Sequence, residues 1–114
     1  MGKYKSRASR LSDAESMCAA ITINDDSTDE DVENAVAEVE EARSIVEELR
    51  DEIENWKSGL EGTNLENTNK YQMLEEAYDR LEDIISSLEG ITEKDDFDEL
   101  ESVDWSVDFP GMFD

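Results

Sequence analysis

The chain has 114 residues, of which 33 are acidic and 10 are basic, and its formal charge is -23. This length predicts a single small domain. The absence of histidine and the presence of only one cysteine exclude the commonest metal ligand, a disulfide framework and a cysteine-based zinc site within one chain. The negative charge also argues against direct binding to nucleic acid or to an anionic membrane.

Residues 1–22 form a basic segment that runs into a short helical pattern. The segment begins with Lys3, Lys5, Arg7 and Arg10, but it lacks the roughly 7–15 apolar residues that follow the charged start of a signal peptide. No stretch of the chain approaches the roughly 20 apolar residues of a membrane span. We therefore expect a cytoplasmic protein whose basic start binds the chain's own acidic face.

Residues 23–29 are a polar linker, and residues 30–90 predict a helical hairpin. Ser27 and Glu30 match the S-x-x-E pattern of a capping box at the start of the first helix. The remaining helix ends are indicated by glycines, which stop helices, and by polar residues, which cap them. The residues that mark these ends are Gly59 and Gly62 after the first helix, Asn67, Thr68 or Asn69 before the second helix, and Gly90 after the second helix.

Both predicted helices carry an apolar heptad repeat, which is typical of a coiled coil. In the first helix it comprises Val32, Val39, Val46, Ile53 and Leu60 at position a, and Ala35, Ala42, Leu49 and Trp56 at d. In the second it comprises Tyr71, Tyr78 and Ile85 at a, and Leu74, Leu81 and Leu88 at d. Antiparallel folding then makes every layer apolar, pairing Trp56 with Tyr71, Ile53 with Leu74, Leu49 with Tyr78, Val46 with Leu81, Ala42 with Ile85, and Val39 with Leu88. The sequence therefore predicts an all-α fold built on an antiparallel coiled-coil hairpin.

One flank of this hairpin is charged. Antiparallel pairing brings the basic e positions of the first helix near acidic e positions of the second. We expect Arg50 to reach Glu75, and Arg43 to reach Glu82. Such exposed pairs contribute about 0–1 kcal/mol each, so their main effect is on the choice of pairing.

The other flank is apolar and needs a cover, because Ile45 lies there near Ala77 and Ile84. A candidate cover is the apolar stripe of the N-terminal segment, formed by Leu11, Ala14, Met17, Cys18 and Ile21. A packed short N-terminal helix is therefore expected, with a homodimer as the alternative way to bury the flank. Cys18 is expected to act as a small buried hydrophobe.

The outer face of the first helix is rich in carboxylates: Glu33, Glu40, Glu47 and Glu54 at b, Glu41 and Glu48 at c, and Asp51 at f. From Asp29 to Gly90 there are 20 acidic and five basic residues, a net charge of -15. Over a helix on the order of 45 Å long, this is about one net charge per 3 Å, or half the density of duplex DNA. One interpretation is a solvated face that keeps the protein soluble or reflects a halophilic source. The other is a face that imitates nucleic acid.

Residues 91–114 form an acidic, aromatic tail in which apolar and polar residues alternate from Val103 to Phe109. Two interpretations stay open. The tail can pack onto the hairpin as a strand or extended arm, or it can be a recognition peptide whose aromatic side chains anchor a partner. The candidate partner-binding residues are Phe97, Trp105, Phe109, Met112 and Phe113.

No motif for catalysis or cofactor binding is present. The chain has no P-loop, no G-x-G-x-x-G and no G-x-S-x-G pattern. The oxygen-rich stretch 24–33 lacks the Gly at position 6 and the Glu at position 12 of an EF-hand loop; starting from Asp25, those places hold Glu30 and Val36. We expect a protein that is not an enzyme and needs neither a metal nor another cofactor.

Four segments, SRASRLSDAES, ENWKSGLEG, KYQMLEEAYDRLEDIISSLEG and VDFPGMF, resemble small acidic helical proteins of tailed bacteriophages. The resemblance implies a phage setting, in which host-takeover and anti-defence roles are common, but it transfers no site residues. By analogy with phage DNA mimics, the leading hypothesis is an inhibitor of a basic nucleic-acid-binding protein. The alternative is a helical adaptor, a homodimer or a phage structural component that uses the apolar flank and the tail.

Overall fold

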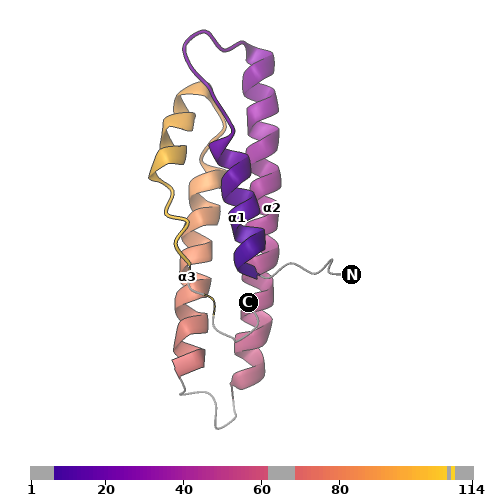
Figure 1. The fold of residues 1–114 in the computed structure, drawn as a ribbon, viewed down its shortest axis with the longest axis vertical. Coiled ribbons are helices and arrows are strands. Elements are labelled where there is room, and N and C mark those ends of the chain that lie inside the picture. The colour runs from indigo at the N-terminus through magenta and orange to yellow at the C-terminus, as the bar shows by residue number, and fades with distance from the viewer. Residues whose placement is uncertain (1–6, 62–68, 108, 110–114) are drawn as a thin grey trace.

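The computed structural model describes residues 7–61, 69–107 and 109. This part of the chain is mostly helical and contains no strand, which confirms the all-α prediction. Its elements are the α-helices α1 (Arg7–Ala19), α2 (Asp29–Leu60) and α3 (Asn69–Glu89) and the 3-10 helix η1 (Lys94–Ser102) (Figure 1). No helix among the described residues is both long enough and apolar enough to cross a membrane.

The centre of the fold is the interface between α2 and α3, which lie side by side and run in opposite directions (Figure 1). Their buried side chains include most of the predicted a and d positions: Ala35, Val39, Ala42, Val46, Leu49, Ile53 and Leu60 in α2, and Leu74, Leu81, Ile85 and Leu88 in α3. Val32, Trp56, Tyr71 and Tyr78 are half-buried against this core. The predicted apolar positions therefore face inward, while the layer-by-layer pairing remains a prediction.

The helix α1 packs along α2 and buries Leu11, Ala14 and Cys18. Its N-terminal turn binds Glu52, whereas Cys18, near its other end, lies within electrostatic reach of Glu38. Glu38 and Glu52 belong to the g column of α2 that also contains Ile45, which is half-buried. The N-terminal segment thus covers the apolar edge of α2, as its stripe of apolar residues predicted.

The start of α2 differs by one residue from the prediction. The capping box is formed by Thr28 and Asp31: the Thr28 hydroxyl accepts from the backbone N–H of Asp31, and the Asp31 carboxylate accepts from that of Thr28, both at 3.1 Å. The predicted box of Ser27 and Glu30 is wrong, because the Ser27 hydroxyl accepts the backbone N–H of Asn24 instead. Ser27 therefore completes the preceding turn.

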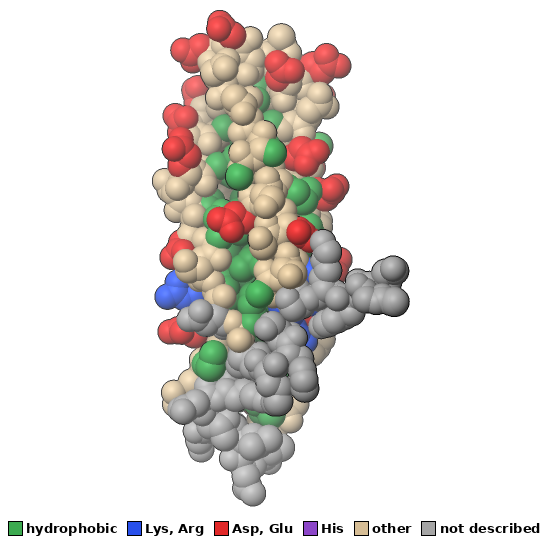
Figure 2. Space-filling model, in the orientation of Figure 1, with side chains coloured by type: hydrophobic (Ala, Val, Ile, Leu, Met, Phe, Trp, Pro, Cys, Tyr) green, Lys and Arg blue, Asp and Glu red, His purple; other side chains and the backbone are tan. Residues whose placement is uncertain are grey.

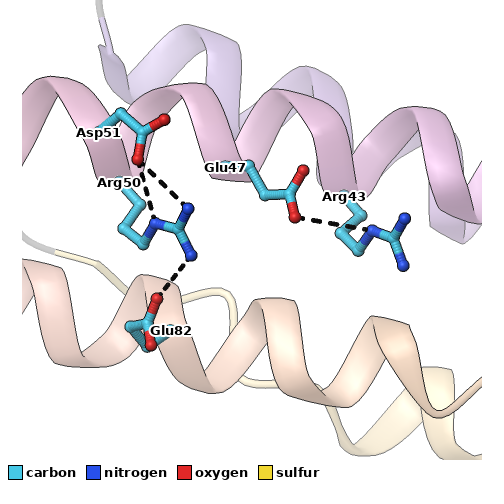
Figure 3. Close-up of polar contacts among 5 residues, drawn as sticks. All are labelled: Arg43, Glu47, Arg50, Asp51 and Glu82. Carbon is cyan, nitrogen blue, oxygen red and sulfur yellow. Dashed lines mark hydrogen bonds and ion pairs between the residues drawn. The ribbon is translucent and has the colours of Figure 1, made fainter.

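The predicted ion pairs between α2 and α3 are also corrected (Figure 3). Arg50 reaches Glu82 at 2.7 Å rather than Glu75, and it also contacts Asp51 at 3.2 Å. Arg43 pairs within its own helix with Glu47, at 3.9 Å, rather than with Glu82. The long arginine side chain allows both choices, and a bond to Glu82 leaves Arg50 close enough to its neighbour Asp51 to bind both carboxylates.

The helix ends follow the glycine pattern only in part. Gly59 lies inside α2, which continues to Leu60 and is followed by Glu61 in an extended conformation. Gly90 directly follows α3, as predicted. Gly62, Asn67 and Thr68 lie outside the described residues, and α3 begins at Asn69.

The described part of the tail packs onto the hairpin. It begins with η1, which the sequence did not predict, and continues as an extended segment rather than a strand over residues 103–107. Phe97 is buried in the core. Lys94 donates to the backbone oxygens of Asp25 and Ser27, at 2.7 and 3.3 Å, and Arg80 of α3 pairs with Asp104 at 3.5 Å. Contacts to both the linker and α3 therefore hold the tail against the helices.

Candidate functional site

The outer face of α2 is positioned by the same heptad that builds the core, because inward a and d positions leave b, c and f pointing outward. Six of the seven predicted residues are exposed, and one, Glu47, is half-buried. The exposed ones are Glu33, Glu40, Glu41, Glu48, Asp51 and Glu54. A helix of 32 residues is about 48 Å long, so these carboxylates are arranged along a rigid rod. We call the seven residues the α2 acidic face.

Two members of the α2 acidic face are partly neutralised by arginines of the same helix (Figure 3). Glu47 pairs with Arg43, and Asp51 pairs with Arg50. The hydrogen bond from Arg50 to Glu82 is the largest of the effects that raise the pKa of Arg50. The other five carboxylates form no ion pair with any described residue. They are Glu33, Glu40, Glu41, Glu48 and Glu54.

The basic N-terminal segment binds an acid at the edge of α2, not on its outer face. Both terminal nitrogens of Arg10 bind Glu52, at 2.7 and 2.6 Å, and Arg7 adds a third bond at 3.1 Å. The hydrogen bond from Arg10 is the main reason why the pKa of Glu52 is lowered. Arg7 also lies over the ring of Trp56, at 5.0 Å from its centroid. These arginines fasten α1 to α2 and leave the α2 acidic face without their charge.

The predicted tail residues differ in how far they are available to a partner. Phe97 is only 7% exposed, so the chain's own core uses it. Trp105 and Phe109 are half-buried and pack against that core. Met112 and Phe113 lie outside the described residues. The structure therefore brings the described tail residues close to α1 and does not bring them to the α2 acidic face.

A groove lies between α1 and the tail, and sequence reasoning did not identify it. We call it the α1–tail groove. One wall is α1, and the other wall is η1 with the extended segment that follows it. Its main part has a volume of about 520 Å³ and is lined on these two sides by Glu15, Cys18, Ile21, Phe97, Leu100 and Trp105, among others. It continues along α1 past Leu11 and Ala8 to Val107 and Phe109. The only sequence signal was the alternation of apolar residues from Val103 to Phe109, which indicated one apolar side of the tail.

Among the described residues, no group of three or more histidine, cysteine or acidic side chains is arranged to hold a metal ion. Two side chains of the stretch 24–33 bind backbone N–H groups. Asn24 accepts from Asp26 at 2.9 Å, and Asp31 accepts from Thr28 at 3.1 Å. Asp31 therefore takes part in helix entry.

Comparison of the chain with protein-family models, with curated proteins and with solved structures finds no match. The assignment of a function therefore depends on the charge and geometry of the surfaces described above.

Proposed function

We propose that this protein is a non-enzymatic inhibitor that occupies the basic groove of a nucleic-acid-binding protein with its α2 acidic face. The observation that carries the proposal is the row of five exposed carboxylates without an ion pair to a described residue. They extend from Glu33 to Glu54 on one helix. The rigid spacing of these carboxylates supports the proposal, because the lysines and arginines that bind a phosphate backbone also lie in a line.

The charge of α2 supports such an interaction. The helix has twelve acidic and three basic side chains, which leaves nine net negative charges over about 48 Å. Binding of these carboxylates to a basic groove releases counterions, as phosphate binding does, and gives an affinity that falls steeply with salt. A surface of this charge repels itself and destabilises the fold, so a binding role gives it a physical reason.

The rigidity of the face depends on the hairpin beneath it. We propose that α2 and α3 form an antiparallel coiled coil with the layers predicted from the sequence. Support comes from the burial of Val46, Leu49 and Ile53 in α2 opposite a buried α3 stripe. Because the packed side of α2 is held over almost its whole length, the acidic side stays straight.

The resemblance to small acidic proteins of tailed bacteriophages gives the proposal a setting. In that setting the partner is a host protein that binds nucleic acid, including restriction and other defence proteins, and the inhibitor acts in the host cytoplasm. The inhibitor itself contacts neither nucleic acid nor a membrane, and it needs no cofactor.

The proposal is tested by capture of partners from a nuclease-treated bacterial lysate, with washes of increasing salt. We expect a basic nucleic-acid-binding protein to bind at low salt, to elute at high salt and to lose its nucleic acid to the inhibitor in a gel-shift competition. A face variant neutralises five carboxylates on α2: Glu33→Gln, Glu40→Gln, Glu41→Gln, Glu48→Gln and Glu54→Gln. A matched control neutralises five exposed acids on α3: Glu75→Gln, Glu76→Gln, Asp79→Asn, Asp83→Asn and Glu89→Gln.

Both variants have the same net charge, so a general charge effect weakens the competition with nucleic acid equally in both. Loss of competition only in the face variant, with helicity unchanged by circular dichroism, supports the proposal. Equal loss in both, or no loss in either, contradicts it.

The alternative of a homodimer or adaptor that uses the apolar flank has less support from the packing. Ala77 and Ile84 are each only 1% exposed within the single chain. Ile45 is half-buried on the edge that α1 covers. The flank therefore offers little apolar area to a second copy.

A further inference from the structure

We propose that the α1–tail groove is a second binding site, which takes a basic amphipathic helix of a partner protein. This surface is separate from the α2 acidic face, and the proposal does not depend on the nucleic-acid-mimic function. The groove lies between α1 and the tail, whose 3-10 helix η1 contacts α3.

The groove has an apolar side. Cys18 and Phe97 are buried at its base, and Leu100, Val103 and Trp105 are half-buried along one wall. These three side chains keep part of their apolar surface exposed in a concave site, and such sites are where ligands usually bind. The occupant must therefore present apolar side chains of its own.

The rim of the groove is acidic. Glu15, Asp98 and Glu101 line it and are exposed, and none of the described lining residues is a lysine or an arginine. Figure 2 shows hydrophobic side chains at several places between the helices, with carboxylates at both edges of the view and near its middle. Carboxylates on the rim attract basic residues and repel acidic ones, so the charge selects a basic occupant.

The length and straightness of the groove favour a helix. It follows α1 from Ala8 to Ala19, a distance of about 17 Å, or three helical turns. A helix laid beside α1 can place apolar side chains at i, i+3, i+4 and i+7 on the groove floor, while lysines and arginines on its borders reach both rims. An extended peptide would alternate its side chains and present only half of them to the floor.

The probe for a binding test is a fluorescein-labelled peptide of leucine and lysine, about 14 residues long, with leucines at i, i+3, i+4 and i+7. A scrambled peptide of the same composition has its leucines spread around the helix. Binding to the full chain is measured by fluorescence anisotropy at about 0.15 M NaCl, where distant charges are screened. We expect the amphipathic peptide to bind about tenfold more tightly than the scrambled one.

Two variants with equal net charge locate the site. The groove variant carries Glu15→Lys, Asp98→Lys and Glu101→Lys, and the matched control carries Glu33→Lys, Glu40→Lys and Glu54→Lys on the α2 acidic face. All six positions are exposed, so both variants are expected to fold. Peptide affinity should fall about tenfold in the groove variant and about twofold or less in the control.

A second measurement follows the two tryptophan indole N–H signals by NMR. Trp105 lines the groove, whereas Trp56 lies in α2 and under Arg7. The peptide should shift the Trp105 signal and leave that of Trp56 in place. This readout reports the location of binding even if a variant loses stability.

Several outcomes overturn the proposal. Equal binding of the scrambled peptide, or equal losses in the two variants, shows attraction to the overall charge rather than to the groove. If Lys3→Glu and Lys5→Glu tighten binding of the amphipathic peptide more than binding of the equally charged scrambled peptide, the chain's own N-terminus is the occupant. A dimer in sedimentation that the groove variant dissociates shows that a second copy is the occupant.

Discussion

Arg10 binds Glu52 through both terminal nitrogens, with distances of 2.7 and 2.6 Å. This two-point contact joins the first helix to the C-terminal third of the second, 42 residues later in the chain. It also places the charges of Arg7 and Arg10 at Glu52, which is not part of the α2 acidic face. The positive charge of α1 is held at the g edge of α2, two residues before the exposed Glu54.

The contact of Arg7 and Arg10 with Glu52 should stabilise the fold. Glu52→Gln keeps the shape of the side chain but removes the charge that binds Arg7 and Arg10. Because the pair is bidentate but partly exposed, we expect the free energy of unfolding to fall by about 1 kcal/mol. Urea denaturation followed by circular dichroism measures this loss. The matched control is Glu54→Gln, which should change stability by less than about 0.5 kcal/mol; an equal effect in both variants would show that the pair contributes nothing.

The same pair predicts a pH dependence. Glu52 has a pKa below its ordinary value of 4.5, mainly because of the hydrogen bond from Arg10. A carboxyl whose pKa is lowered in the folded state stabilises the fold above the unfolded pKa, and that contribution is lost as the pH falls through the folded pKa. The stability difference between the wild type and Glu52→Gln should therefore be full at pH 7 and vanish at strongly acidic pH. A difference that is independent of pH would assign the effect to packing instead.

Cys18 should be unreactive in the folded protein. Burial, with a smaller contribution from Glu38, raises the pKa of its thiol from 9.0 to about 11. This lowers the fraction of reactive thiolate by about 100-fold at neutral pH. We expect slow reaction with a thiol reagent in the native state and fast reaction in urea. The matched control is Ala19→Cys in a Cys18→Ala background, since Ala19 is exposed; rapid labelling of native Cys18 would mean that α1 is not docked on α2.

The helix cap of α2 should depend on Thr28. Removal of the hydroxyl in Thr28→Ala takes away the acceptor for the Asp31 N–H, and caps of this kind contribute about 1 kcal/mol. Ser27→Ala removes a hydroxyl from the adjacent turn only, and should cost less than about 0.5 kcal/mol. Thermal denaturation of the two variants distinguishes the positions. A larger loss of stability for Ser27→Ala than for Thr28→Ala would indicate that Ser27 and Glu30 form the capping box, as the S-x-x-E pattern predicted.

Docking of the tail should depend on Phe97. Truncation of this buried side chain in Phe97→Ala leaves a cavity, and we expect a loss of about 3 kcal/mol in unfolding free energy. The control is Met73→Ala on α3, because Met73 is 38% exposed and has little packing to lose. A negligible effect of Phe97→Ala would indicate that the tail leaves the helices in solution. It would then also weaken the case for the α1–tail groove, one wall of which is the tail.

The ambiguous points of the sequence were those where two patterns fit equally well. Ser27 with Glu30 and Thr28 with Asp31 both have the spacing of a capping box. The reciprocal bonds of Thr28 and Asp31, and the bond from the Asn24 N–H to Ser27, distinguish them in the structure. The heptad of α3 places acidic residues at the e positions of two levels, Glu75 and Glu82, and Arg50 binds Glu82. Such choices between near neighbours depend on distances of a few ångströms, which no heptad assignment contains.

The amino-acid pattern alone specified the all-α class, the inward stripe of α2 and the outward row of carboxylates, because the helical period fixes which residues share a face. It also indicated that the apolar edge at Ile45 needs a cover. Tertiary structure alone decided that Phe97 belongs to the core, that Arg10 binds Glu52 and that a groove remains between α1 and the tail. Arg10 and Glu52 are 42 positions apart, and the groove brings Cys18 of α1 near Phe97 of η1. Such contacts depend on how whole elements pack rather than on any local period.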